Sequence, residues 1–184
     1  ESWTYSQINN SANMLASKLI NDGINHGDRV VLFMENRPDY VISILALNKI
    51  GAIGVLINTS LTGQPLIHCI NSSDSKKCIF GAELSIPLSE VLDKINIKNK
   101  LDFLWVKDTD DYECPYWASD LKFQLDAINI NNLAITNKVT AKDIAFYIFT
   151  SGTTGVPKAA LFPNVKIIAA AVNITKGGYR MNDK

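Results

Sequence analysis

Short apolar runs alternate with stretches of helical periodicity along the first half of the chain, and this alternation limits the folds open to it. Residues 30–34 (VVLFM) and 53–57 (IGVLI) are typical of buried strands, and a helical stretch separates them. Another helical stretch, with Leu66 and Ile70 on its apolar face, precedes a short strand at 78–80. Strands and helices in this order predict βαβ units, so we expect an α/β fold with a parallel sheet covered by helices.

Helix-start signals support this order of elements. Thr4 is suited to cap the first helix, because Gln7 three residues later completes a capping box. Pro38 fits the first turn of the second helix, and Thr62 is placed to cap the third. The second helix is apolar on nearly every side between residues 40 and 50, so we expect it to be buried.

One apolar run, residues 40–58, is long enough to suit a bilayer. Asn48 and Lys49 lie near its centre, where a lysine costs roughly 2.5–3.5 kcal/mol on insertion scales. Gly51 offers a helix stop, after which the chain is typical of a buried strand. We therefore favour a packed helix followed by a strand over a membrane span.

The second half carries weaker signals. We expect a helix over residues 88–95 and a strand over 101–106, followed by a loop and an asparagine-rich connection without periodicity. The charge run at 108–113 is typical of a solvated surface. Residues 144–149 (IAFYIF) and the AALF segment after Lys158 predict two more strands, so the loop between them joins strand to strand.

Composition excludes several function classes. Eighteen basic residues balance eighteen acidic ones, and no segment gathers a basic stripe of the kind that binds nucleic acid. The three cysteines, Cys69, Cys78 and Cys114, form no CxxC pair, which favours reduced thiols in the cytoplasm over a disulfide framework or a zinc site. We expect Cys69 and Cys78 to be small core residues.

The loop in YIFTSGTTGVPK, residues 147–158, has the chemistry of a phosphate-binding site. Glycine lets the backbone approach phosphate oxygens, hydroxyl and N–H groups donate hydrogen bonds, and a lysine supplies positive charge. The candidate phosphate ligands are Thr150, Ser151, Gly152, Thr153, Thr154, Gly155 and Lys158. Pro157 stiffens the exit from the loop toward Lys158.

The spacing in this loop excludes two better-known phosphate loops. A Walker A loop needs four residues between its glycines and a lysine directly after the second, whereas two residues separate Gly152 from Gly155 here. The dinucleotide G-x-G-x-x-G pattern is absent as well. A plain Gly/Ser/Thr linker is the remaining alternative, and the apolar strands on both sides argue against it.

TSGTTGVPK resembles the phosphate-binding signature of the adenylate-forming enzymes, which include acyl-CoA synthetases, luciferases and the adenylation domains of peptide synthetases. Upstream segments resemble the opening of the same large N-terminal domain in the same order: WTYSQINNSANMLASKL, GINHGDRVVLFMENRPDYV and NKIGAIGVLIN. The resemblance implies a partial N-terminal AMP-binding domain over residues 1–184. It comprises a βαβ region at about 1–106, an irregular connection at about 107–140, and a strand, phosphate loop and strand at about 144–163.

Within that superfamily the chain looks most like the fatty-acid transport protein and very-long-chain acyl-CoA synthetase branch. INTSLTGQPLIHCINSS followed by CIFGAEL carries this likeness, and His68 and Cys69 match the HC pair of the branch. Thr62 stands where the branch usually has arginine, and PNVKII replaces its usual histidine and aromatic-rich stretch. The resemblance therefore does not assign the acyl chain.

The resemblance implies a ligase that uses ATP, Mg²⁺ and coenzyme A to activate a fatty acid through an acyl-adenylate. In that family the magnesium-binding acid, the adenine pocket, the acyl tunnel and a small C-terminal domain with a catalytic lysine follow later in the chain. We therefore expect no catalytic residue and no metal ligand within these 184 residues, and no activity from them alone.

Other roles stay open. The acid is a long- or very-long-chain fatty acid, or else a carnitine-type, bile-acid or aryl acid; the non-enzymatic alternatives are fatty-acid uptake and nucleotide binding. We expect a cytoplasmic protein, with peripheral attachment to the inner face of a membrane left open. His68 is interpreted as a structural histidine with its hydrogen bonds satisfied, rather than as a catalytic base, because no carboxylate partner is recognisable near it in the sequence.

Overall fold

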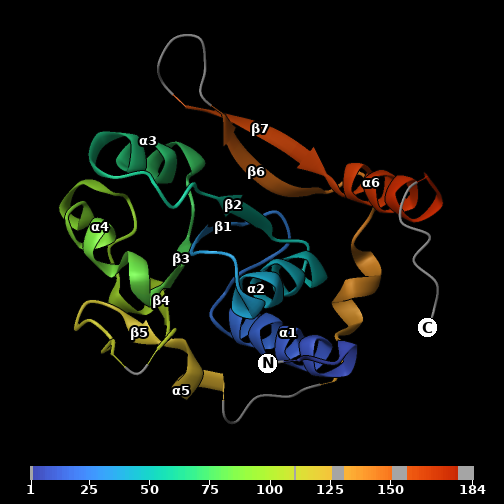
Figure 1. The fold of residues 1–184 in the computed structure, drawn as a ribbon, viewed down its shortest axis with the longest axis horizontal. Coiled ribbons are helices and arrows are strands. Elements are labelled where there is room, and N and C mark those ends of the chain that lie inside the picture. Colours follow the sequence, from blue (N-terminus) through green and yellow to red (C-terminus); the bar gives the residue numbers. More distant parts are fainter. Residues whose placement is uncertain (1, 110, 126–130, 151–156, 178–184) are drawn as a thin grey trace.

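The computed structural model describes residues 2–109, 111–125, 131–150 and 157–177 of the chain. Within these residues seven strands form one sheet in the order β5-β4-β3-β1-β2-β6-β7 (Figure 1). The strands are β1 (Arg29–Phe33), β2 (Ile53–Leu56), β3 (Lys77–Gly81), β4 (Phe103–Val106), β5 (Ser119–Asp120), β6 (Ile144–Thr150) and β7 (Lys158–Pro163). All neighbouring pairs are parallel except β6 and β7, which run antiparallel.

Helices lie on both faces of this sheet. The α-helices are α1 (Tyr5–Asn21), α2 (Pro38–Lys49), α3 (Gly63–Ser73), α4 (Ser85–Ser89), α5 (Leu121–Leu125) and α6 (Asn164–Gly177). Short 3-10 turns are η1 (Ala82–Leu84), η2 (Leu92–Lys94), η3 (Lys100–Asp102) and η4 (Ala134–Lys138). The predicted α/β class with a mostly parallel sheet and flanking helices is confirmed.

The two faces bury separate apolar clusters because alternate strand residues point to opposite sides. Val31 of β1 and Phe80 of β3 belong to the cluster under α3 and α4, whereas Leu32 and Ile79, their neighbours along each strand, belong to the cluster under α1, α2 and α5. Cys78 is fully buried in the first cluster, as expected. The register that joins β1 to β2 and β3 therefore fixes both cores at once.

The capping signals are confirmed in part. Thr4 caps α1, with its hydroxyl accepting from the Gln7 backbone N–H and the Gln7 side chain accepting from the Thr4 N–H. Pro38 occupies the first turn of α2. Thr62 stands at the N-cap of α3, but its side chain makes no capping bond within the described part of the chain.

The expected burial of α2 on nearly every side is wrong. Ile42, Ala46 and Leu47 pack inward, while Val41 and Leu45 on the outer face are 47% and 38% exposed. The helix lies in one layer on the sheet, so only one face is covered. The run at 40–58 forms this helix followed by β2, and no helix among the described residues is long and apolar enough to cross a membrane.

The middle of the chain differs most from the prediction. The helix expected at 88–95 is split into α4, which already ends at Ser89, and the turn η2. The expected strand at 101–106 begins only at Phe103, because η3 precedes it. The connection expected to be irregular contains β5 and α5, which carry little periodicity because they are two and five residues long.

Candidate phosphate-binding site

The antiparallel hairpin of β6 and β7 carries the candidate phosphate loop. Thr150, the last residue of β6, pairs with Lys158, the first residue of β7, and the Thr150 hydroxyl donates to the Lys158 carbonyl at 3.5 Å. The predicted change from strand to strand around the loop is therefore confirmed. Five of the seven candidate ligands, Ser151, Gly152, Thr153, Thr154 and Gly155, lie outside the described residues.

The hairpin brings Thr150 and Lys158 to the carboxyl edge of the sheet. β6 runs parallel to β2, so its end lies at the same edge as the ends of β1, β2 and β3. Both side chains are exposed, and Lys158 has no ion-pair partner among the described residues. An exposed ammonium group with no carboxylate beside it is available to bind an anionic ligand. An ammonium group in a structural ion pair would already be neutralised.

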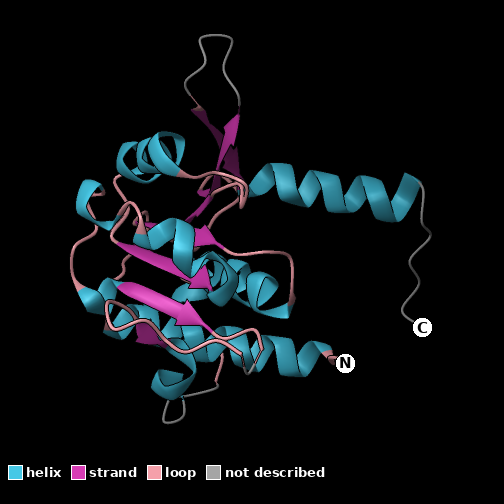
Figure 2. Ribbon diagram, turned by 60° about the vertical axis from the view of Figure 1, so that its left-hand side comes forward, coloured by secondary structure: helices cyan, strands magenta, loops and turns pink. Residues whose placement is uncertain are grey.

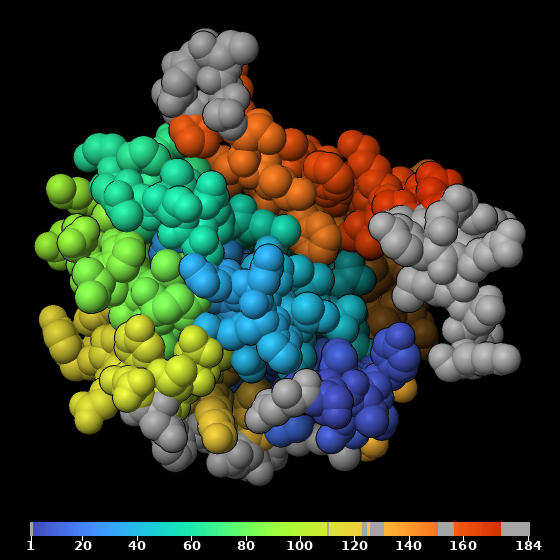
Figure 3. Space-filling view, viewed as in Figure 1, coloured from blue at the N-terminus to red at the C-terminus, as the bar shows by residue number. Residues whose placement is uncertain are grey.

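His68 reaches this site from α3. Its Nε2 lies 2.9 Å from the carbonyl oxygen of Pro157, so this ring nitrogen has a hydrogen-bond partner, in line with the structural role that the sequence interpretation expected. Its partner is 89 positions away in the chain, which sequence reasoning could not foresee. Figure 3 shows α3 and the hairpin side by side on the molecular surface.

The other histidine, His26, lies away from this site. It pairs with Asp143 at 3.1 Å near the start of β6.

At the usual ligand crevice of a doubly wound sheet, the Glu83 side chain is hydrogen-bonded across the strand ends. The chain reverses its winding between β1 and β3, the point where such folds bind ligands beyond the strand ends. There the Glu83 carboxylate accepts from the Glu35 backbone N–H and from Arg37 Nη1, both at 2.8 Å. It lies over Gly81, where a Cβ would come within 2.2 Å of Glu83 Oε2. The candidate site is thus displaced to the hairpin, two strands from the switch point.

Arg37 is further tied to the end of β4. Its Nη2 donates to the Val106 carbonyl at 3.3 Å, and Asp108 lies 3.5 Å from Nη1. Asp108, expected to be merely solvated, therefore belongs to this cluster. Sequence reasoning missed the cluster, although Arg37 and Glu83 each follow a predicted strand, and the carboxyl ends of parallel strands share an edge.

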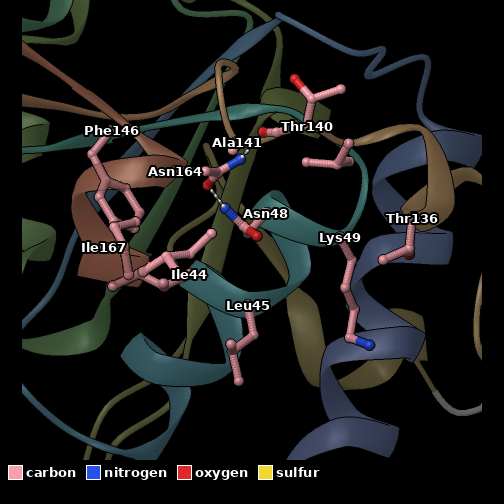
Figure 4. Close-up of a pocket in the computed structure, with 12 residues that line it drawn as sticks. Ile44, Leu45, Asn48, Lys49, Thr136, Thr140, Ala141, Phe146, Asn164 and Ile167 are labelled. Carbon is pink, nitrogen blue, oxygen red and sulfur yellow. Dashed lines mark hydrogen bonds between the residues drawn. The ribbon is translucent and has the colours of Figure 1, made fainter. Parts of the chain in front are cut away.

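A hollow with a polar lining and a pocket with an apolar lining lie at different places on the surface. A polar hollow of about 380 Å³, lined by Glu35, Asn36, Asn58 and Thr59 among others, lies at the carboxyl ends of β1 and β2. An apolar pocket of about 400 Å³ lies between α2, η4 and α6, with Asn48 donating to Asn164 at 2.6 Å (Figure 4). Phe146, near the start of β6, is the residue of this strand that lines the pocket, whereas Thr150 lies at the other end of the strand.

These features define a doubly wound α/β domain whose candidate site lies on an added antiparallel hairpin. The model of the AMP-binding enzyme family matches residues 1–184. The chain therefore belongs to the AMP-binding enzyme family.

Curated proteins similar to this chain are fatty acid transport proteins and a CoA ligase. Long-chain fatty acid transport protein 6 of Mus musculus is 30% identical over 185 residues, which cover 98% of this chain and 29% of that protein. Long-chain fatty acid transport protein 1 of Rattus norvegicus is 33% identical, over 86% of this chain and 24% of its own length. Medium/long-chain-fatty-acid–CoA ligase FadD6 of Mycobacterium tuberculosis is 32% identical over an alignment that covers 97% of this chain and 28% of that protein. The chain spans less than a third of the length of these relatives.

Solved structures agree with this assignment. The N-terminal domain of FACL13 from Mycobacterium tuberculosis superposes with a TM-score of 0.76 at 28% identity, covering 92% of this chain and 39% of that one. A long-chain-fatty-acid CoA ligase from Rhodopseudomonas palustris, described as putative, gives a TM-score of 0.80 at 20% identity and shows the shared fold.

Proposed function

We propose that the complete protein is an ATP-dependent ligase that joins a long- or very-long-chain fatty acid to coenzyme A. The observation that carries this proposal is the exposed Lys158, beside Thr150, at the stem of a TSGTTGVPK loop in a chain that matches the AMP-binding family throughout. The names of the relatives, long-chain fatty acid transport protein and medium/long-chain-fatty-acid–CoA ligase, support a fatty acid as the substrate.

The proposed reaction has two balanced steps. A fatty-acid carboxylate oxygen attacks the α-phosphorus of ATP, forming acyl-adenylate and releasing pyrophosphate. The coenzyme A thiol, after losing its proton, attacks the acyl carbonyl carbon and displaces AMP. Repulsion between anions and charge on the departing pyrophosphate oppose the first step, so positioning and electrostatic stabilisation supply most of the catalysis.

In this proposal Lys158 binds the pyrophosphate end of ATP, together with Thr150, Ser151, Gly152, Thr153, Thr154 and Gly155. The free ammonium group at the carboxyl edge fits a polyphosphate, because no carboxylate among the described residues neutralises it. Mg²⁺ enters only as the ion that accompanies ATP. The described residues bring together no group of three His, Cys, Asp or Glu that could hold it.

The test is ATP–pyrophosphate exchange by the complete reading frame, with acids of increasing chain length and with aryl, bile-acid and carnitine-type acids in the same panel. We expect exchange that depends on a long-chain acid and weakens in Lys158→Ala. Exchange with none of these acids, from protein shown to be folded, would overturn the proposal.

A second candidate function is fatty-acid uptake without ligation, which the names of the transport-protein relatives favour. It predicts faster uptake of a labelled fatty acid by cells that express the protein, with no acid-dependent exchange in the purified protein. Cytoplasmic location and attachment to a membrane stay predictions.

A further inference from the structure

The hydrogen bond between α3 and the hairpin has a fixed direction. A carbonyl oxygen only accepts, so His68 donates through a proton on Nε2 to the oxygen of Pro157 at 2.9 Å. α3 is itself anchored, because Leu66, Cys69 and Ile70 on either side of His68 are buried under the sheet with at most 1% exposure. The donor therefore projects from a rigid element.

The acceptor lies directly before the candidate phosphate ligand. The Pro157 carbonyl and the Lys158 N–H belong to one planar peptide group, so a bond to that oxygen restrains the direction in which the chain enters Lys158. The ring of Pro157 already restricts φ on the preceding side. On the following side, the Thr150 hydroxyl donates to the Lys158 carbonyl at 3.5 Å. Lys158 is therefore held through the peptide groups on both sides of its Cα.

The hydrogen bond from His68 supports Lys158 at the edge of the sheet, where a residue has the fewest neighbouring strands. β7 is the last strand in the order, and Lys158 is its first residue, with an exposed side chain. Neighbouring backbone is paired on the β6 side alone within the described residues. An exposed lysine at the end of an edge strand has little packing to direct it, so the hydrogen bond from α3 adds a restraint from outside the hairpin to the pairing with Thr150.

We infer that His68 is a positioning residue for Lys158 on the phosphates of the nucleotide, an inference that rests on the proposed function. His68 touches neither substrate nor reacting atoms; it acts through the Pro157–Lys158 peptide group. Because misplacement of a substrate-binding group lowers the rate without unfolding the protein, removing the donor lowers kcat/KM for ATP by roughly tenfold.

The experiment uses the complete reading frame and two substitutions of similar size. His68→Gln keeps an N–H donor at a comparable reach, whereas His68→Met has no donor. Ser72→Ala, at an exposed position further along α3, is the matched control. ATP–pyrophosphate exchange at saturating acid, with ATP varied, separates KM from kcat, and thermal unfolding monitors the fold.

We expect His68→Met to raise KM for ATP or lower kcat while Tm stays close to that of the unmodified protein, and we expect His68→Gln to restore most of the lost activity. A double-mutant cycle tests the route through Lys158. His68→Met should lower exchange much less in a Lys158→Ala background than alone, because the group that it positions is already gone. Equal losses in both backgrounds, or equal losses for Gln and Met, would overturn the inference.

Amide hydrogen exchange separates this inference from the proposed function. The peptide covering residues 157–163 should exchange faster in His68→Met than in His68→Gln, whether or not the protein ligates a fatty acid. If the unmodified protein shows no acid-dependent activity, the ligase proposal fails and amide exchange alone decides the positioning role. Unchanged exchange of this peptide in His68→Met would overturn that role.

Discussion

At the scale of single residues, we expect Lys158→Ala to affect activity much more than stability. Its side chain is exposed and unpaired within the described chain, so Lys158→Ala should change the free energy of unfolding by no more than about 0.5 kcal/mol. Loss of a charge that stabilises the departing pyrophosphate should lower kcat for exchange by roughly 100-fold. Lys142, also exposed but at the start of β6, is the matched control. Equal activity losses in Lys142→Ala and Lys158→Ala would contradict a specific role.

Asp28 gives the protein a predictable response to acid. Burial alone would raise the pKa of this carboxyl, but hydrogen bonds from Lys76 Nζ at 2.7 Å and from the Asn25 N–H at 2.8 Å outweigh it and lower the pKa below its ordinary value of 3.8. A lowered folded pKa stabilises the fold fully above the ordinary value, and this stabilisation is lost as the pH falls through the folded pKa.

Asp28→Asn should therefore be less stable than the unmodified protein at neutral pH and should lose less stability below pH 3.8. Urea unfolding at a series of pH values measures both effects. Asp111→Asn, in the exposed acidic loop, is the control. A parallel acid response in Asp28→Asn and the unmodified protein would show that the carboxylate is not the group responsible.

At the scale of elements, the Arg37–Glu83 pair links the ends of β1, β3 and β4. Both side chains are largely buried, at 11% and 17% exposure, and Glu83 also accepts from a backbone N–H. Glu83→Gln removes the nearest and most buried carboxylate from the Arg37 guanidinium and leaves it the more exposed Asp108 at 3.5 Å, so we expect a loss of about 1–3 kcal/mol in the free energy of unfolding.

Combining Glu83→Gln with Arg37→Met tests whether the two residues act as one unit. The double variant should be more stable than the sum of the single losses predicts, by about 0.5–3 kcal/mol, because the interaction between the two side chains is counted in both single losses. Denaturant unfolding of the four proteins gives the coupling. Strict additivity would mean that the strand ends are held by other contacts.

The sequence predicted the elements whose local pattern of apolar or capping residues matches their place in the folded structure. The apolar runs of β1 and β2 are buried on both faces, and Thr4 with Gln7 makes the capping box that their spacing implies. The long-range pairs were beyond prediction, because the contact of His68 with Pro157 depends on the strand order and not on any nearby residue. β5 was not predicted for a different reason: its two residues are too few to show the alternation of apolar and polar side chains that marks a strand.

At the scale of the whole molecule, the apolar pocket between α2, η4 and α6 lies apart from the described candidate phosphate ligands. Phe146 is the residue of β6 that lines this pocket, and Thr150 is the last residue of that strand. About 13 Å of strand separates the two residues. Figure 2 shows that α6 extends away from the sheet. Val165 and Ile168 on this helix are 50% and 53% exposed.

Residues 1–184 on their own should therefore fold without activating a fatty acid. They span between 24% and 29% of the relatives' length, and the apolar pocket between α2, η4 and α6 does not include the described candidate phosphate ligands. We expect a folded circular dichroism spectrum and cooperative unfolding, with no acyl-adenylate trapped by hydroxylamine above background. The complete reading frame, assayed in parallel, should form it. Adenylate from residues 1–184 alone would mean that acid and nucleotide meet on this part of the chain, and the prediction would be wrong.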